Sequence, residues 1–231
     1  MAYDSKNNIL FLHIPKTGGK SIESALGIIT EEQAMNFRGR SIWNRIGTAI
    51  QRRTSNQAFR KLLYGTIDVT LTGQHLTYQE IKLLALLSQK QLEDSFIFST
   101  VRNPYDKAVS TFRHHCYRTD GDMGAKGFEK FWSTWGFSDS TDHGTLSFRR
   151  EQIDFLRETD GTIVADEILR FETLKKDFEK IRTRFSHASE LPKVGFTNHK
   201  KSYQEYYTSS SRKIIEDLFA TDIEYFGYSF D

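Results

Sequence analysis

Positive charge, hydroxyl groups and glycines are concentrated in one short stretch near the start of the chain, residues 12–21, with the sequence LHIPKTGGKS. Two lysines attract an anion, two hydroxyls donate hydrogen bonds to it, and two glycines let backbone N–H groups close around it. This combination is typical of a loop that binds a phosphate or sulfate group between a strand and a helix. The residues expected to contact the anion are Lys16, Thr17, Gly18, Gly19, Lys20 and Ser21.

The same loop partly matches the Walker A pattern of P-loop NTPases, which ends in Gly-Lys-Ser as residues 19–21 do. Ile14 stands where that pattern requires its first glycine. An NTPase also needs an acidic residue after an apolar strand to hold Mg²⁺, and the candidate is Asp166, at the end of TIVAD. An NTPase or kinase is therefore one interpretation of this loop, and an enzyme that binds another anionic ligand is the other.

A second phosphate-binding group is predicted within residues 98–114, FSTVRNPYDKAVSTFRH. Arg102 follows an apolar run, and a guanidinium at the end of a strand grips phosphate in a bidentate manner. Ser110 lies on the following helix, away from its apolar stripe, where its hydroxyl can add a hydrogen bond. The competing interpretation is that Arg102 forms a surface ion pair with Asp106.

For a general base we choose His75, in TLTGQHLTY, because it follows a predicted strand and strand ends line the ligand crevice of such sheets. Imidazole titrates near neutrality, which suits removal of a proton from an alcohol. A loop histidine with one structural hydrogen bond is the alternative. Glu23 is the backup base, and His13, at the edge of its strand, is expected to shape the loop.

These residues lie at the ends of apolar runs that alternate with helical patterns. Strands are predicted at 8–14, 66–72, 96–101 and 167–171. Helices are predicted at 21–26, 78–87 and 211–220, and a further helix begins at Pro104. Another helix is predicted from the apolar stripe of Leu174, Phe178, Ile181 and Phe185. Residues 119–144, rich in Gly, Asp and Ser, are expected to be irregular structure held by aromatic rings, namely Phe128, Phe131, Trp132 and Trp135. The alternation predicts an α/β fold with a parallel sheet.

Composition limits the class of protein. With 231 residues, 38% of them hydrophobic, we expect a single domain spanning residues 1–231. The single cysteine, Cys116, suits a reducing compartment, so we expect a cytoplasmic protein. No run is apolar and long enough for a membrane span. The seven histidines are scattered, so no metal site is expected, and the net charge of +2 is too small to indicate nucleic acid.

Charge is unevenly distributed, because residues 33–65 hold no acidic residue. The basic residues of this insertion are Arg38, Arg40, Arg45, Arg52, Arg53, Arg60 and Lys61. A solvated surface is one interpretation. The other is a landing site for an anionic acceptor.

Taken together, the loop at 12–21 resembles the 5′-phosphosulfate loop of the sulfotransferases that use 3′-phosphoadenosine 5′-phosphosulfate (PAPS). The similarity is to the branch of heparan sulfate 2-O-sulfotransferases and their bacterial relatives, which usually reads HIPKTGGTS, with Thr where this chain has Lys20. Residues 98–114 resemble the family's 3′-phosphate motif, with Arg102 and Ser110 at the matching positions. Residues 170–181 and 198–215 resemble later family segments, the second of which would bring Lys201 and Ser202 to the donor.

The resemblance implies a P-loop-like, three-layer α/β fold and transfer of a sulfuryl group from PAPS to a hydroxyl. It implies that Lys16 stabilises the departing phosphate and that His75, in an element close to the family's G-H-x-x-[YF], is the base. No metal is needed. The acceptor is expected to be a glycan, plausibly an acidic saccharide, and nucleic acid is not expected as a partner. Besides the NTPase, the alternative is a protein that binds polyanions without turnover.

Overall fold

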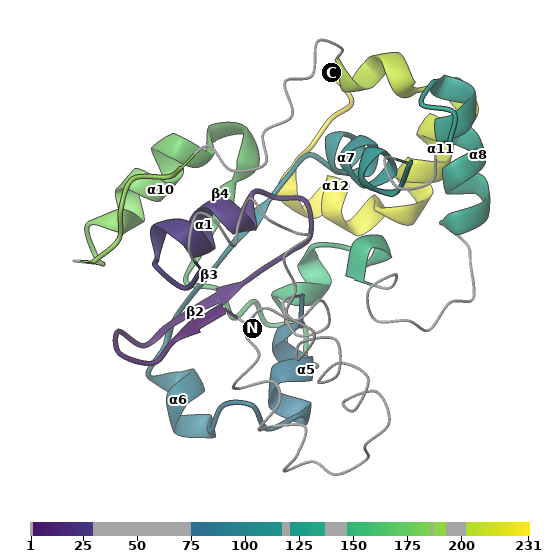
Figure 1. Ribbon diagram of the computed structural model, residues 1–231. Coiled ribbons are helices and arrows are strands. Elements are labelled where there is room, and N and C mark those ends of the chain that lie inside the picture. Colours follow the sequence, from purple (N-terminus) through teal and green to yellow (C-terminus); the bar gives the residue numbers. More distant parts are fainter. Residues whose placement is uncertain (1, 30–74, 117–120, 137–146, 186, 193–201) are drawn as a thin grey trace, which may run out of the picture. The chain divides into compact units, whose positions relative to one another are not determined.

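The computed structural model describes residues 2–29, 75–116, 121–136, 147–185, 187–192 and 202–231 (Figure 1). The chain divides into two compact units, each described by itself below. Unit 1 comprises Met1–Val101 and Phe155–Phe196, and unit 2 comprises Arg102–Asp154 and Thr197–Asp231. The single domain expected from the sequence stays a prediction.

Unit 1 contains a sheet of strands in the order β1-β2-β3-β4. The strands are β1 (Ala2–Asp4), β2 (Ile9–Leu12), β3 (Phe96–Val101) and β4 (Glu167–Arg170). β2, β3 and β4 are parallel neighbours, and β1 pairs with β2 in the antiparallel direction. Because the carboxyl ends of parallel strands share one edge, the loop after β2 begins at the edge where β3 ends.

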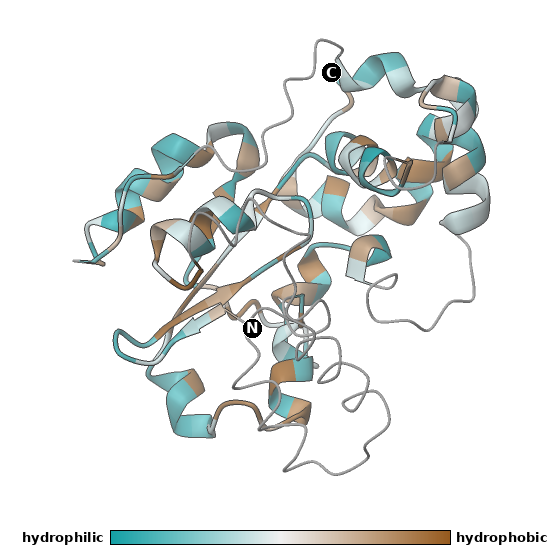
Figure 2. Cartoon of the chain, in the orientation of Figure 1, coloured by the Kyte–Doolittle hydropathy of each residue, from teal (hydrophilic) through white to brown (hydrophobic). Residues whose placement is uncertain are grey.

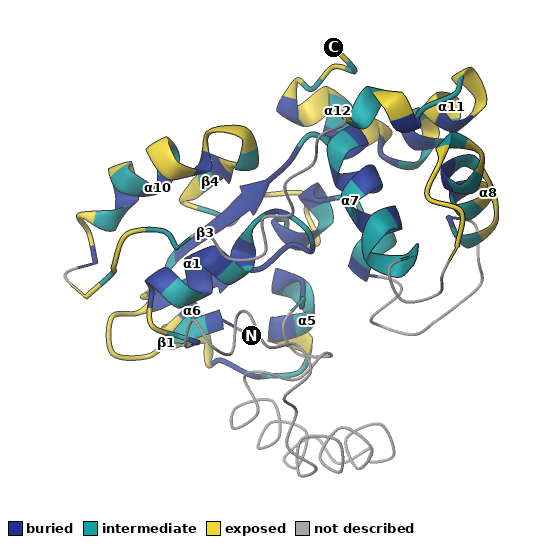
Figure 3. Ribbon diagram, turned by 45° about the horizontal axis from the view of Figure 1, so that its top comes forward, coloured by how far each residue is buried: buried dark blue, intermediate teal, exposed yellow. Residues whose placement is uncertain are grey.

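Helices pack on this sheet through apolar side chains. The helical elements of unit 1 are α1 (Gly19–Ala25), α5 (Tyr78–Leu83), α6 (Gln89–Glu93), η2 (Phe171–Thr173) and α10 (Leu174–Arg182). One core cluster joins α1 and α10 to the sheet through Ile22, Phe11, Phe98 and Phe178. β2 is hydrophobic along its whole length, and β3 is buried from Ile97 onward (Figures 2 and 3). Such strands are typical of a sheet covered on both faces.

Unit 2 is helical in its described part. Its elements are α7 (Pro104–Cys116), α8 (Ala125–Trp135), η3 (Tyr203–Tyr206), α11 (Ser209–Leu218) and α12 (Ala220–Phe226). The short η1 (Ile153–Phe155) begins in this unit. The core is largely aromatic, with Phe112, Phe128, Trp132 and Phe219 fully or almost fully buried. Edge-to-face ring contacts, such as that of Phe112 on Phe128, fix the geometry of this core.

The α/β fold and three of the predicted strands are confirmed, as β2, β3 and β4. The expectation of irregular structure at 119–144 is wrong for its central part, where α8 forms. The helix expected at 78–87 ends earlier, at Leu83, because Ala85 adopts a left-handed conformation with φ of 49°. The strand expected at 66–72 and the basic insertion at 33–65 lie outside the described residues.

Besides α8, the strand β1 and the helices α6 and α12 were not predicted from the sequence. β1 is too short for a periodic pattern, and α12 follows α11 after a break at Phe219. Within the described residues, none of the helices combines the length and the apolar character that crossing a bilayer requires.

Candidate functional site

The loop between β2 and α1 has an unusual backbone conformation. Lys16 and Gly18 both have positive φ, 67° and 88°. A residue with a side chain is uncommon in this region, and such strain is found where a structure must aim backbone groups at a ligand. Left-handed residues turn neighbouring N–H groups toward a common point, which creates a concavity for anions. The backbone of the loop is thus compatible with anion binding, and the roles of its residues stay predictions.

Gly18 and Gly19 pack so closely against neighbouring side chains that no larger residue fits. A Cβ on Gly18 would lie 2.8 Å from Leu174 Cδ2, and one on Gly19 would lie 2.2 Å from His13 Nε2. Either distance is too short for a real contact, so the loop is held between the start of α10 and the His13 ring. Gly19 therefore serves close packing, and Gly18 serves both close packing and a left-handed backbone.

The His13 ring packs against the loop at Gly19. Its Nδ1 lies 2.7 Å from Glu23 Oε1 on α1, and both side chains are buried. Because a carboxylate only accepts, His13 donates through Nδ1 and turns Nε2 toward Gly19. Glu23, the backup base in the sequence analysis, is therefore engaged in holding His13.

His75 lies directly beside this pair. Its Nδ1 is 2.9 Å from the backbone carbonyl of His13, and the two imidazole rings meet edge to face at 4.6 Å. Since a carbonyl oxygen cannot donate, Nδ1 of His75 carries the hydrogen, and in the neutral ring Nε2 is then the basic nitrogen. The structure thus brings together His75, His13, Glu23 and the loop glycine Gly19.

The predicted hydroxyl donors of the loop differ in their surroundings. The Thr17 hydroxyl is buried, donates to the carbonyl of Ile14 at 2.9 Å and lies 2.7 Å from Thr100 Oγ1 at the end of β3. It therefore ties the loop to the sheet, and only its backbone N–H can face an anion. Ser21 is also buried. Among the described residues, no side chain caps α1, whose N-cap is Gly18. Lys16 and Lys20 are partly exposed.

Arg102, in unit 2, is the residue after β3 and is only 8% exposed. Its Nε and Nη2 lie 2.8 and 2.7 Å from Asp106 Oδ2, so the ion pair considered in the sequence analysis exists. The guanidinium is buried rather than on the surface. Ser110 follows Asp106 by one helical turn on α7 and is partly exposed. Arg102, Asp106 and Ser110 therefore share one face at the start of this helix.

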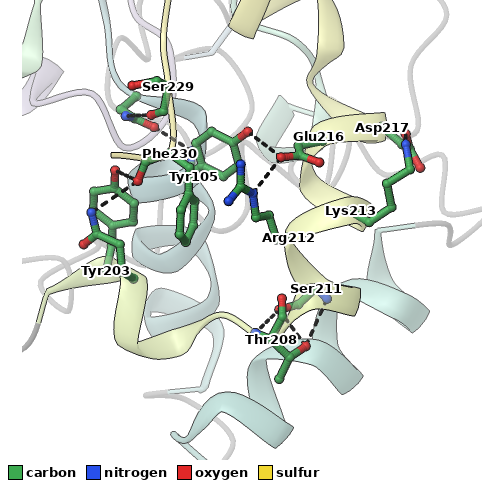
Figure 4. A network of polar contacts seen from close by, with 12 residues as sticks. Tyr105, Tyr203, Thr208, Ser211, Arg212, Lys213, Glu216, Asp217, Ser229 and Phe230 are labelled. Carbon is green, nitrogen blue, oxygen red and sulfur yellow. Dashed lines mark hydrogen bonds and ion pairs between the residues drawn. The ribbon is translucent and has the colours of Figure 1, made fainter.

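The residues near Ser202 are held by the C-terminal segment of unit 2 (Figure 4). The Tyr203 hydroxyl donates to the carbonyl of Phe230 at 2.8 Å, and Asn103, next to Arg102, donates to the carbonyl of Ser229 at 2.9 Å. The Ser202 hydroxyl contacts Gln204, and its N–H donates to Glu205. Lys201 lies outside the described residues.

The same network contains Tyr105, whose hydroxyl donates to Glu216 Oε1 at 3.1 Å, and Arg212, whose Nε donates to the same oxygen at 2.8 Å. Burial, followed by the Glu216 charge, raises the pKa of Tyr105 to about 12. Tyr105 therefore stays protonated at neutral pH and donates its hydroxyl hydrogen to Glu216.

Asp166, the acid that an NTPase would need for Mg²⁺, binds the backbone of β3. Its Oδ2 accepts from the N–H of Ile97 at 2.7 Å, and its own N–H donates to the carbonyl of Ile97 at 2.7 Å. Residues 162–166 form no strand, since only an isolated bridge joins Ile163 to Arg157. Neither feature matches a Walker B strand.

Three buried polar residues of unit 2 were missed by sequence reasoning. They are Lys107 on α7, Gln152 before η1 and Asp222 on α12. Burial lowers the pKa of Lys107 to about 8 and raises that of Asp222 to about 6, and in each case the charge of the other residue opposes the shift. No spacing or motif distinguishes these residues in the sequence. Their burial reveals them, and of the three Gln152 hydrogen-bonds directly to Arg102.

Within the described ranges, no three His, Cys, Asp or Glu side chains come together as metal ligands, and the expected independence of metal stays a prediction. A family model described as the sulfotransferase family matches residues 1–229. The comparisons with curated proteins and with solved structures gave no match. The match covers nearly the whole chain, including the loop after β2, Arg102 and both units. The chain belongs to the sulfotransferase family.

Proposed function

We propose that this protein is a PAPS-dependent sulfotransferase that transfers the sulfuryl group to a hydroxyl of a glycan. The observation that carries the proposal is the loop after β2, where the left-handed Lys16 lies in the same loop as Gly19, which packs on His13, and His13 in turn contacts His75. An anion-binding backbone and an oriented imidazole are the two parts that this transfer requires.

The proposed reaction uses these groups as follows. Nε2 of His75 takes the proton of the acceptor hydroxyl while its oxygen forms a bond to sulfur. The bond between sulfur and the bridging oxygen of the 5′-phosphate breaks, and adenosine 3′,5′-bisphosphate (PAP) leaves with the additional negative charge. Lys16 stabilises that charge, and the backbone of residues 17–21 holds the phosphate. Glu23 is the weaker candidate for the base, because its carboxylate is buried against His13.

For the other end of the donor we propose Arg102 and Ser110 as the groups that bind the 3′-phosphate. A guanidinium with a fixed orientation suits this role, and Asp106 provides the orientation. Lys201 and Ser202 are proposed as further contacts to the nucleotide. PAPS carries phosphate at both the 5′ and 3′ positions, which fits two separate phosphate-binding groups better than ATP does.

The proposed acceptor is a hydroxylated glycan with acidic groups, in line with the resemblance of this chain to the heparan sulfate 2-O-sulfotransferase branch. The basic residues within 33–65 support an anionic acceptor. Trp132 does not stack on a sugar, because it is fully buried in the core of unit 2, whereas Trp135 is half-buried against Phe131. A cytoplasmic location is proposed from the single cysteine.

The test is transfer of labelled sulfate from PAPS to a panel of saccharides and simple alcohols. We expect transfer without added metal, its loss in Lys16→Ala, and a reduction of about 10²–10⁴-fold in kcat in His75→Ala with PAP binding retained. Lys6→Ala, which removes an exposed lysine of unit 1, is the matched control and should transfer normally.

Two results would contradict the proposal. Stabilisation by ATP with Mg²⁺ but not by PAP would favour an NTPase or kinase. Strongly salt-dependent binding to heparin, without transfer to any acceptor, would favour a polyanion-binding protein.

A further inference from the structure

Both backbone polar groups of Arg102 are bound by one side chain, that of Gln152. The Arg102 N–H donates to Gln152 Oε1 at 2.8 Å, and Gln152 Nε2 donates to the Arg102 carbonyl at 2.9 Å. The register of β3 with β4 ends at Val101, paired with Arg170, so Arg102 is the first residue beyond this ladder. The carboxamide thus takes the place of a neighbouring strand at the residue where β3 gives way to α7.

Gln152 is itself held in place from α12. Its backbone N–H donates to Asp222 Oδ2 at 2.7 Å, and the N–H of Ile153 donates to Asp222 Oδ1 at 2.9 Å. Gln152 and Asp222 are both 0% exposed. Charge-assisted hydrogen bonds in such a dry environment are strong, and they leave the Gln152 backbone little freedom.

The charge of Asp222 is balanced by Lys107, which belongs to the helix that follows Arg102. Lys107 is almost fully buried, donates to the carbonyl of Arg150 at 3.3 Å and lies 4.7 Å from the centre of the Phe219 ring. Asp222 and Lys107 attract one another across this core. Hydrogen bonds thus connect Arg102 through Gln152 to Asp222, and the charge of Asp222 is attracted by Lys107 on α7.

We infer that Gln152 is a positioning residue that fixes the backbone of Arg102, and thereby determines how strongly the protein prefers nucleotides with a 3′-phosphate. The inference rests on the proposed function, in which Arg102 binds that phosphate. Gln152 holds the backbone of Arg102, and Asp106 holds its guanidinium. An arginine fixed at both ends loses little conformational entropy on binding, so its contact with phosphate is stronger.

The chemistry requires an amide at position 152. A carboxamide offers one acceptor for the Arg102 N–H and one donor for the Arg102 carbonyl. In Gln152→Glu the donor is replaced by a carboxylate oxygen that faces the carbonyl. In Gln152→Met both hydrogen bonds are lost, although the volume is kept. Both variants should release the Arg102 backbone without removing any group proposed to touch the donor.

The experiment compares the affinities of PAP and adenosine 5′-monophosphate by isothermal titration calorimetry, since these nucleotides differ in the 3′-phosphate. We expect wild type to prefer PAP, and Arg102→Ala to lose the preference. Gln152→Met and Gln152→Glu should reduce the PAP-to-monophosphate affinity ratio by about tenfold or more, with monophosphate affinity unchanged. Gln79→Met is the matched control, because the Gln79 amide also donates to a backbone carbonyl, that of Arg157, at 3.2 Å.

Circular dichroism and thermal unfolding check that each variant is folded. If the Gln152 variants do not fold, Asp222→Asn decides, because it weakens the support of Gln152 while keeping the shape of the side chain; the ratio should again fall. A folded variant that keeps the wild-type ratio would overturn the inference and leave the proposed function intact. A wild-type protein with no preference for PAP would instead overturn the proposed function, and the inference with it.

Discussion

Gly19 is the residue at which the packing of the loop after β2 can be tested most directly. Alanine would normally be favourable in a helix, but a Cβ here meets His13 Nε2 at 2.2 Å. We predict that Gly19→Ala lowers the free energy of unfolding by about 1–3 kcal/mol, as overpacking does. The double variant His13→Ala/Gly19→Ala should lose clearly less stability than the sum of the single variants, because the clash is removed. Urea denaturation measures all three.

The control for this double-mutant cycle is Gly27→Ala. A Cβ on Gly27 would meet no neighbouring atom, but the residue has a φ of 68°. Its loss of stability reports only the left-handed backbone, about 1–2 kcal/mol, and it should not interact with His13→Ala. Additive effects of the Gly19 and His13 substitutions would show that the ring does not limit this position.

Single residues could be predicted from the sequence where a motif marks them. Lys16, Gly18 and Gly19 were proposed as site residues because charge and glycine follow an apolar run, and Arg102 because it precedes Asn-Pro at the end of another. Their roles stay predictions. Gln152 could not, because its role depends on hydrogen bonds to residues 50 positions earlier and 70 positions later. Thr17 was predicted as a donor to the ligand, yet its hydroxyl points into the protein.

At the scale of elements, α8 contributes to the core of unit 2, and Trp132 is its largest fully buried ring. We predict that Trp132→Ala destabilises the protein by about 3–5 kcal/mol, the usual effect of removing a buried aromatic side chain. Trp135→Ala should destabilise it less, since Trp135 is half-buried. Thermal and urea unfolding give both values.

Activity distinguishes the core role of Trp132 from sugar binding. Trp132→Phe, which keeps most of the apolar volume, should leave the KM for the acceptor unchanged. A raised acceptor KM in a variant of normal stability would mean that this ring contacts the substrate after all.

The strands were predicted more accurately than α8, for a physical reason. Buried parallel strands are continuous apolar runs. The segments ILFL of β2 and FIFSTV of β3 are such short apolar runs, which favour a strand over other structures. In α8 the rings Phe128, Phe131, Trp132 and Trp135 follow helical spacing, but aromatic residues and Gly127 are weak helix formers. Packing among the rings outweighs that low propensity, and such packing is invisible until the partners in α7 and α11 are known.

At the scale of the whole molecule, charge is the property that bears on the acceptor. The net charge is only +2, yet residues 33–65, which lie outside the described ranges, carry seven basic residues and no acidic one. We predict that the double variant Arg52→Glu/Arg53→Glu raises the KM for a carboxylated or sulfated saccharide by about tenfold at low salt, because opposite charges steer association. The KM for PAPS should stay constant, as measured in initial-rate assays.

Salt provides the internal control for this prediction. The difference between wild type and the double variant should shrink as ionic strength rises, because screening weakens interactions between exposed charges. If wild type and the double variant have equal KM values for an acidic acceptor at low salt, the basic insertion does not contribute to acceptor binding.

The fold class and family were both predictable at this scale, because the loop after β2 and the segment around Arg102 are local signals carried by the sequence. The identity of the acceptor was not, since acceptor recognition depends on surface shape and on side chains brought together from distant segments. Trp132 illustrates the difference, because its burial in the core of unit 2 follows from contacts with other helices and not from its own segment.

The short strand β1 has a consequence for how the protein behaves at high concentration. Ala2, Tyr3 and Asp4 pair with Phe11, Leu10 and Ile9, so they occupy the hydrogen-bonding groups on one side of β2. Without them, an apolar strand with unpaired N–H and C=O groups would face outward, and such edges recruit strands from other molecules. These three residues therefore protect β2 against aggregation, and β2 is the strand that leads into the loop at residues 13–18. Their removal is expected to reduce solubility before it changes any chemistry.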